Sequence, residues 1–227
     1  MENGCYTALI TPFTPAGELD QTGLEQLIEF QIHNGITGIL VTGTTGESPT
    51  FKWQEHNHVI DLSAKQIRGR CRVIAGTGSN NTDEAVTAAG HAAGQGVDAL
   101  LMVDPYYNGP SSLEIRREYY EAVAARYPDM EIIPYIIPGR TGAQMLPPDL
   151  ALLAKSCPNV RSVKEATGNL DNMKFTRKCC GPDFQIFSGD DALVFDIMTD
   201  PDIRACGAIS VMSNIVPGFM TQMVSAI

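Results

Sequence analysis

The chain contains 227 residues, of which 44% are hydrophobic, and it carries a formal net charge of −10. This length suits one large α/β domain or two small ones, and because no linker or repeat divides the chain we expect a single domain over residues 1–227. The acidic balance argues against nucleic acids and anionic membranes as binding partners.

Eight short runs rich in Val, Ile, Leu and Thr are expected to form strands, and none alternates cleanly between apolar and polar residues. They cover residues 7–13, 38–42, 73–77, 99–104, 132–137, 160–165, 185–188 and 207–211. Such runs are typical of parallel strands that are buried on both faces. Helical patterns follow each strand, over residues 22–34, 52–68, 82–95, 111–126, 147–156, 170–180, 192–199 and 217–227.

This repeated alternation of strands and helices favours a (β/α)₈ TIM barrel. A doubly wound open sheet is the alternative, but it would need a glycine-rich dinucleotide-binding turn after the first strand. Residues 11–14, at that position, contain no glycine. We therefore predict an α/β protein built as a closed barrel.

Six cysteines are scattered along the chain without a C-x-x-C pair, which indicates reduced thiols rather than a disulfide framework or a zinc site. The first residues contain no apolar signal segment, and no apolar run is long enough to span a bilayer. We expect a cytoplasmic protein that does not associate with membranes.

Lys164 lies near the end of the sixth predicted strand and is the most informative residue of the chain. Burial disfavours the charged ammonium, so it lowers the pKa of a lysine. A neutral amine in a dry pocket is a nucleophile toward carbonyl carbon, which is how Schiff-base catalysis begins. The alternative is a lysine that reaches the surface or pairs with Glu165.

Other reactive side chains lie in the carboxyl-terminal parts of predicted strands or just after them, where a TIM barrel collects its catalytic groups. Thr44 and Thr45, flanked by glycines, can cradle a carboxylate with hydroxyls and backbone N–H groups. Tyr107 and Tyr135 can pass protons near an amine. Arg140 offers a planar fork for a second carboxylate. With the buried amine, this set describes amine catalysis on a 2-oxo acid and a second anionic substrate.

Metal binding is not expected. Asp190 and Asp191 follow the seventh strand and could be metal ligands, but a helix N-terminus favours carboxylates and capping is the expected role. His56 and His58 are two residues apart on a predicted helix and face different sides, which argues against a zinc pair. We expect neither a metal ion nor an organic cofactor.

Four motifs stand at these strand ends: Gly43-Thr44-Thr45-Gly46-Glu47, Pro105-Tyr106-Tyr107-Asn108, residues 135–142 and residues 163–169. Together they resemble the dihydrodipicolinate synthase family, which are class I aldolases of the N-acetylneuraminate lyase superfamily. The resemblance runs in order from about Thr7 to the end of the chain, so it covers the predicted barrel.

The resemblance implies a Schiff-base aldol condensation of pyruvate with L-aspartate 4-semialdehyde, the committed step toward diaminopimelate and lysine. It implies that Lys164 forms the imine with pyruvate and that Tyr135 is the general acid/base. Thr44 would link Tyr135 to Tyr107, which in the family reaches in from the neighbouring subunit. Metal ions and organic cofactors have no part in this reaction.

Substrate-binding residues also follow from the resemblance. Thr45 would hold the pyruvate carboxylate, and the carbonyl of Ile209 would face the bound pyruvate. Gly189, at the end of the seventh strand, is assigned to substrate contact. Arg140 would hold the carboxylate of L-aspartate 4-semialdehyde.

The family also has a feedback site for L-lysine at a dimer interface. The matching residues here are Ser48, Pro49, Trp53, His56, Asn80, Glu84 and Tyr106. Glu84 would receive the ammonium of the ligand, and Tyr106 or Asn80 its α-carboxylate. Packing of Trp53 in an interface is the alternative.

The resemblance implies a homo-oligomer, either a dimer or a tetramer of dimers. Family members continue past the eighth helix into a helical C-terminal segment, which we expect this chain to lack. The expected loss concerns subunit assembly, because none of the assigned site residues lies in that segment.

Two other functions remain open. Sister aldolases, such as N-acetylneuraminate lyase or 2-keto-3-deoxygluconate aldolase, share the tyrosine and the lysine but cleave sugar acids. Arg140 and the paired Thr44 and Thr45 favour aspartate semialdehyde instead. A non-catalytic barrel that senses pyruvate or lysine is the second, and the complete set of reactive groups argues against it.

Overall fold

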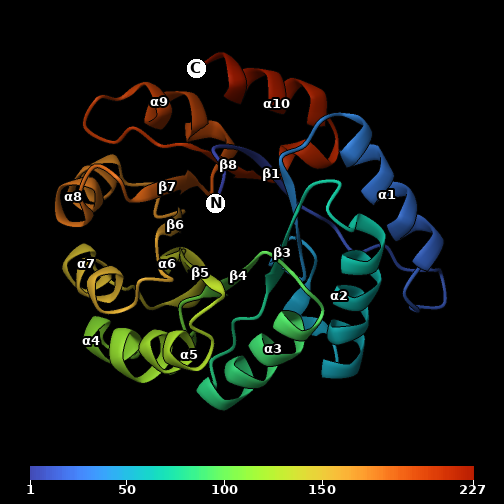
Figure 1. The fold of residues 1–227 in the computed structure, drawn as a ribbon, viewed down its shortest axis with the longest axis horizontal. Coiled ribbons are helices and arrows are strands. Elements are labelled where there is room, and N and C mark those ends of the chain that lie inside the picture. The colour runs from blue at the N-terminus through green and yellow to red at the C-terminus, as the bar shows by residue number, and fades with distance from the viewer.

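Eight parallel strands close into a barrel in the computed structural model, which describes all 227 residues (Figure 1). The strands pair in chain order, and β1 also pairs with β8. This arrangement confirms the predicted (β/α)₈ barrel. The strands are β1 (Gly4–Ala8), β2 (Gly38–Val41), β3 (Arg72–Gly76), β4 (Ala99–Val103), β5 (Glu131–Ile136), β6 (Ser162–Glu165), β7 (Gln185–Ser188) and β8 (Gly207–Ser210).

Helices surround the barrel as an outer ring (Figure 1). The α-helices are α1 (Gln21–His33), α2 (Trp53–Ile67), α3 (Thr82–Gly94), α4 (Ser112–Glu114), α5 (Glu121–Arg126), α6 (Pro138–Thr141), α7 (Pro147–Ser156), α8 (Leu170–Cys180), α9 (Val194–Thr199) and α10 (Pro217–Ala226). Short 3₁₀ turns are η1 (Ser48–Thr50), η3 (Asp191–Leu193) and η4 (Met212–Asn214), and η2 (Ile115–Tyr120) is a π-helix. None of the helices combines the length and the apolar character that a membrane crossing requires.

The core has two layers, as the pattern of fully buried strands predicts. Side chains inside the barrel form a small cluster. In it the Tyr6 and Phe187 rings pack edge to face, with 5.6 Å between their centroids. A larger cluster of 42 buried residues lies between the strands and the helices. Burial on both faces explains why the strands lack alternation between apolar and polar residues.

The predicted boundaries of seven strands differ from the observed ones by at most two residues, but the first strand was placed wrongly. The prediction covered residues 7–13, whereas β1 ends at Ala8. The N–H of Leu9 still donates to the Leu40 carbonyl on β2, but the groups on either side of it bond to a side chain: Asn214 donates to the Ala8 carbonyl and accepts from the N–H of Ile10. Ile10 is 40% exposed, so its apolar character did not indicate a buried strand.

The predicted helix over residues 111–126 is one continuous helical segment of three kinds, namely α4, η2 and α5. Ser111 caps its start and accepts from the N–H of Glu114, whose carboxylate accepts in return from the N–H of Ser111. The π-helical turn between Ile115 and Tyr120 was not predicted, because apolar spacing does not distinguish it from an α-helix.

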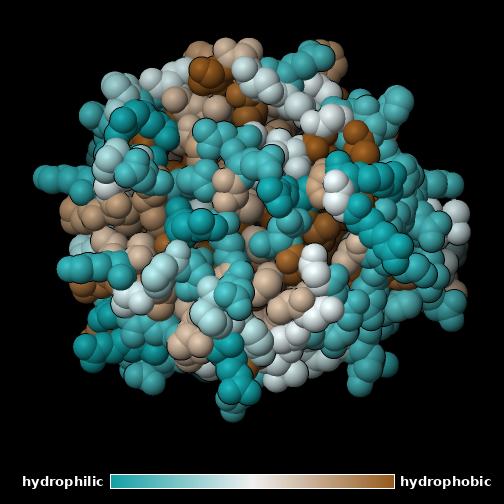
Figure 2. All heavy atoms as spheres, viewed as in Figure 1, coloured by the Kyte–Doolittle hydropathy of each residue, from teal (hydrophilic) through white to brown (hydrophobic).

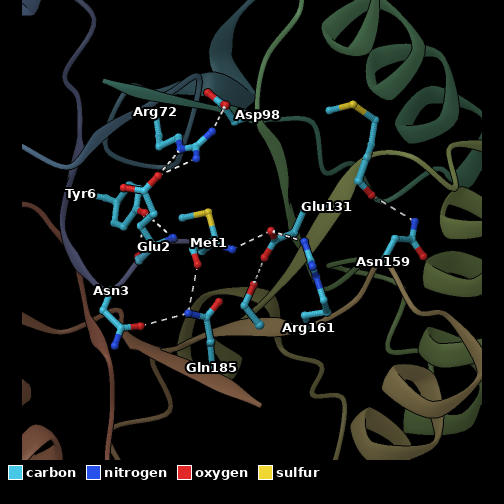
Figure 3. A network of polar contacts seen from close by, with 12 residues as sticks. Met1, Glu2, Asn3, Tyr6, Arg72, Asp98, Glu131, Asn159, Arg161 and Gln185 are labelled. Atoms are coloured by element: carbon cyan, nitrogen blue, oxygen red, sulfur yellow. Dashed lines mark hydrogen bonds and ion pairs between the residues drawn. The ribbon is translucent and has the colours of Figure 1, made fainter. Parts of the chain in front are cut away.

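A network of polar contacts closes the amino end of the barrel (Figure 3). The α-amino group of Met1 pairs with Glu131 at 2.7 Å, and both groups are buried. Arg161 and Ser162 also donate to the Glu131 carboxylate. In TIM barrels this end serves stability, and the opposite end carries the chemistry.

The face of the molecule in Figure 2 is mostly hydrophilic, but hydrophobic residues gather near its centre and over α10 at the top. Around α10, Ile215 and Phe219 are 74% and 73% exposed. Exposed apolar residues are normal singly and informative only in clusters.

Candidate active site

Lys164 lies in the third position of β6, buried inside the barrel with 4% of its surface exposed. Its backbone stands between Tyr135 on β5 and Phe187 on β7. The lysine neither reaches the surface nor pairs with Glu165, whose carboxylate accepts from Asn172 instead. Both alternative readings of this residue are therefore wrong.

Burial lowers the pKa of Lys164 from 10.5 to about 7. Two nearby charges act in opposite directions, because Asp191 raises the pKa and Arg140 lowers it. A large fraction of the amine is thus uncharged at neutral pH, as attack on a carbonyl carbon requires.

We predict that Lys164→Met stabilises the protein at pH 7. Between pH 7 and 10.5 the folded chain binds fewer protons at Lys164 than the unfolded chain, so stability increases with pH across this window. The buried ammonium therefore costs stability most fully below pH 7. Removing it should raise Tm by roughly 5 °C or more at pH 7, with a gain that shrinks toward pH 10.

Thermal unfolding of both proteins at several pH values measures this difference. Lys174→Met is the matched control, because Lys174 is 40% exposed and pairs with Asp200. It should bring no gain in Tm. A Lys164→Met protein that is less stable at pH 7, or a gain that does not depend on pH, contradicts the prediction.

Tyr135 places a phenol beside the amine. The Nζ atom of Lys164 lies 4.3 Å from the centroid of the Tyr135 ring, and the tyrosine is 5% exposed. Burial raises the pKa of Tyr135, whereas Arg140 and the hydroxyl of Thr44 act to lower it. The phenol therefore keeps its proton at neutral pH and can donate it to a substrate.

Arg140 lies in the short helix α6, which follows β5 directly. Its side chain is exposed and forms no ion pair within the chain, so a loop salt bridge is excluded. Its positive charge acts on both Lys164 and Tyr135. An unpaired guanidinium at this position is free to bind an anion.

Thr44 and Thr45 form a tight turn after β2. Thr44 lines the same pocket as Tyr135, and Thr45 is half-buried. The neighbouring Gly46 must be small, because a Cβ there would lie 2.9 Å from the carbonyl oxygen of Leu9. The turn is therefore packed closely against the segment after β1.

Gly189 and Ile209 lie at the ends of the last two strands. A Cβ at Gly189 would lie 3.2 Å from Cε of Lys164 and 2.7 Å from Cβ of Ala166, so a side chain there would crowd the lysine. Ile209 is fully buried in β8, with its side chain in the cluster inside the barrel. The strand topology thus brings both residues into the wall around Lys164.

Tyr107 is not part of the buried site within this chain. It is 89% exposed and has a left-handed backbone with φ of 76°. Its N–H donates to the carbonyl of Thr141, which connects the loop after β4 to α6. Within one chain Tyr107 therefore faces solvent, whereas Lys164 and Tyr135 are buried.

A pocket of about 160 Å³ opens beside the site. It joins Thr44 and Tyr135 to most of the residues assigned to lysine binding: Ser48, Pro49, Trp53, His56, Glu84 and Tyr106. Asn80 is exposed and lies outside the lining. The Trp53 and His56 rings meet at 5.0 Å, and burial lowers the pKa of His56 to about 4, so this imidazole is neutral.

The paired aspartates have separate roles. Asp190 caps η3 and accepts from the N–H of Ala192, which confirms the predicted capping. Asp191 was expected to do the same, but its carboxylate accepts from the N–H groups of Val211 and Met212 instead. It therefore ties the loop after β7 to the loop after β8, a contact that sequence spacing could not predict.

The chain is similar to known proteins in sequence and in fold. A model of the dihydrodipicolinate synthetase family matches residues 1–227. The 4-hydroxy-tetrahydrodipicolinate synthase of Nitratidesulfovibrio vulgaris strain Miyazaki F is 44% identical over 223 residues, or 98% of this chain and 74% of its own length.

Two solved structures are also similar. Dihydrodipicolinate synthase from Cyanidioschyzon merolae with lysine bound has a TM-score of 0.93 and 39% identity, covering 98% of this chain and 74% of that one. The chloride-inhibited enzyme from Acinetobacter baumannii, complexed with pyruvate, has a TM-score of 0.91 and 33% identity, covering 100% of this chain and 76% of that one.

Proposed function

This chain belongs to the dihydrodipicolinate synthetase family, and from that premise we propose that it condenses pyruvate with L-aspartate 4-semialdehyde through a Schiff base on Lys164. The observation that carries this proposal is the buried amine with a lowered pKa, 4.3 Å from the centre of the Tyr135 ring. The activity is that of a lyase in lysine and diaminopimelate biosynthesis.

The reaction starts when the neutral Nζ of Lys164 attacks C2 of pyruvate. The carbonyl oxygen leaves as water, and the resulting iminium withdraws electrons from the methyl group, which then loses a proton to give an enamine. The enamine carbon attacks the aldehyde carbon of the second substrate. The amino group of that substrate then attacks the imine carbon, which closes the ring and frees Lys164.

Proton transfer belongs to Tyr135, with Thr44 and the Tyr107 of a neighbouring subunit extending the relay. A protonated phenol beside the amine supports this assignment, because it can give a proton to the departing oxygen and take one back. Tyr107 is exposed at the tip of its loop, where a second copy of the chain could receive it. A homo-oligomer, a dimer or a tetramer of dimers, is therefore part of the proposal.

The proposed substrate-binding residues offer hydrogen bonds or positive charge to the carboxylates of the two substrates. Thr45 and the adjacent backbone bind the pyruvate carboxylate, with Gly189 and the Ile209 carbonyl around the reacting carbon. Arg140 binds the carboxylate of L-aspartate 4-semialdehyde, which is supported by its exposed and unpaired guanidinium.

The test of this function is a comparison of substrates. Purified protein should form product from pyruvate and L-aspartate 4-semialdehyde and should release little pyruvate from N-acetylneuraminate or 2-keto-3-deoxygluconate. Faster cleavage of a sugar acid would instead favour the sister aldolases. Binding of pyruvate without turnover of any of these substrates would favour a sensor.

We predict that Arg140→Ala weakens the binding of L-aspartate 4-semialdehyde but not that of pyruvate. Loss of a charged hydrogen bond to the carboxylate should raise KM for L-aspartate 4-semialdehyde by about 10- to 100-fold. Arg140→Lys keeps the charge but lacks the planar fork, so its KM for L-aspartate 4-semialdehyde should lie between those of the unaltered protein and Arg140→Ala. Steady-state kinetics with each substrate varied in turn measures the effect, and an equal rise in both KM values would contradict it.

L-Lysine inhibition is the proposed regulation, with Glu84 as the partner of the lysine side chain. Glu84→Gln should weaken inhibition by millimolar L-lysine about tenfold. Asp83→Asn is the control, because it removes a neighbouring exposed charge at the start of the same helix. Initial rates of the unaltered protein that do not change in millimolar L-lysine would reject lysine regulation.

A further inference from the structure

Asp104 is a fully buried carboxylate that has no role in the reaction described above. It follows β4 directly and is 0% exposed. The N–H of Met145 donates to its Oδ2 atom at 2.9 Å, and its Oδ1 atom lies 2.8 Å from the hydroxyl of Tyr120. Neither partner is charged, and burial raises the pKa of Asp104 to about 7. A buried acid held by neutral partners is costly and calls for a physical reason.

The π-helix η2 brings Tyr120 to this carboxylate. Tyr120 is fully buried, and its hydroxyl lies 2.8 Å from both the Met102 carbonyl and the Asp104 carboxyl group. The adjacent Tyr119 is also buried, and its hydroxyl accepts from the N–H of Ser79. π-Helical turns are rare and are found frequently at functional sites. Here the turn lets two successive tyrosines contact two different loops.

Asp104 connects the loops that carry Tyr107 and Arg140. Its own N–H donates to the carbonyl of Tyr135, and its side chain holds Met145 at the far end of the segment that contains Arg140. Between these points, the N–H of Tyr107 donates to the carbonyl of Thr141. The segment after β5 is thus fixed at its start by the barrel and at its end by Asp104.

We propose that the Asp104–Tyr120 pair positions the segment of Arg140 for binding of the second substrate. Asp104 and Tyr120 touch no substrate in this role, so both are positioning residues. The inference rests on the proposed function, because it assigns Arg140 to the carboxylate of L-aspartate 4-semialdehyde. Lys164 lies on β6 and Thr45 in the turn after β2, away from the segment that follows β5, so the pair should not affect formation of the imine with pyruvate.

Asparagine at position 104 separates shape from charge. Its carbonyl oxygen can accept from the N–H of Met145, and its NH₂ group can donate to Tyr120, whose hydroxyl then donates to the Met102 carbonyl. Asp104→Asn should therefore keep the geometry of a protonated aspartic acid. Asp104→Ala leaves the Met145 N–H buried without a partner, and Tyr120→Phe removes only the hydroxyl.

Kinetics with each substrate varied separately tests the proposal. Tyr120→Phe should raise KM for L-aspartate 4-semialdehyde about fivefold and Asp104→Ala about tenfold or more, whereas Asp104→Asn should stay within about twofold of the unaltered protein. The rate of imine formation with pyruvate, followed by borohydride trapping, should change less than about twofold in all three. Tyr127→Phe is the matched control, since Tyr127 is the C-cap residue of the same helical segment and the change removes its hydrogen bond to the carbonyl of Val86.

The outcomes separate this inference from the proposed function. If the unaltered protein does not consume L-aspartate 4-semialdehyde, the proposed function fails. If it does, and Tyr120→Phe leaves the aldehyde KM unchanged, only the positioning role fails. An equal loss of imine formation and aldehyde binding would also overturn it, because that result indicates general damage. If Asp104→Ala does not fold, the KM values of Tyr120→Phe and Asp104→Asn still test the positioning role.

Discussion

Replacing Lys164 with arginine is expected to lower kcat by at least about 10⁴-fold, the order of loss seen when an enzyme loses its nucleophile. Arginine keeps the positive charge and the length of the side chain. Its guanidinium stays protonated at any working pH, so it has no free electron pair for attack on pyruvate. The variant therefore tests the chemistry of the amine rather than its charge.

Borohydride reduction in the presence of pyruvate, followed by mass mapping of peptides, measures the intermediate directly. The unaltered protein should carry a pyruvyl adduct on the peptide that contains Lys164, and Lys164→Arg should carry none. Lys174→Arg, at an exposed ion pair, should behave like the unaltered protein. An adduct on a peptide without Lys164 would show that another residue forms the Schiff base with pyruvate.

The pH dependence of the same adduct gives an independent check. The pKa of Lys164 is about 7, so the neutral fraction of the amine should increase about tenfold for each pH unit below 7 and level off above it. Imine formation should follow this fraction. An exposed lysine would instead show a rate that still increases near pH 10.

Tyr135→Phe is expected to lower kcat by about 10²- to 10⁴-fold, the usual contribution of a positioned general acid. The change removes one oxygen and leaves the ring that covers the amine. Lys164 should still form the imine with pyruvate, but more slowly. The adduct of the amine and pyruvate must lose water to become the imine, and without the phenol no proton donor assists that step. Trapping with borohydride should therefore recover an adduct after longer incubation.

Tyr6→Phe is the matched control for this substitution. Tyr6 also lies in the cluster inside the barrel, but its hydroxyl donates to the carbonyl of Glu2 at the amino end (Figure 3). Its removal should change kcat little. Comparable losses for the two variants would show that packing of the interior, and not proton transfer, sets the rate.

Local sequence was sufficient for most elements but misplaced the first strand. Residues 9–13 have the apolar character of a strand, yet the Asn214 side chain takes the backbone groups on both sides of Leu9. Asn214 lies at the other end of the chain, so no local pattern could reveal this competition. The π-helical turn was missed for a similar reason, since its extra residue is set by what Tyr119 and Tyr120 contact.

Most of the candidate site followed from motifs at strand ends, because parallel strands in a barrel bring their carboxyl ends to one face. Asp104 was not among them. A single acidic residue after an apolar strand has no distinctive spacing, and its partners Tyr120 and Met145 are 16 and 41 residues away. The contact of Asp191 with the N–H groups of Val211 and Met212 also joins distant parts of the chain, so local sequence could not predict it.

The order of the strands, the closed barrel and the side chains gathered at its carboxyl end were determined by the sequence alone, through the spacing of apolar runs and the residues that follow them. Only the tertiary structure decided which of those side chains lose contact with water. Removal of a charge from water depends on packing between distant segments, and this is what makes the amine of Lys164 nucleophilic at neutral pH.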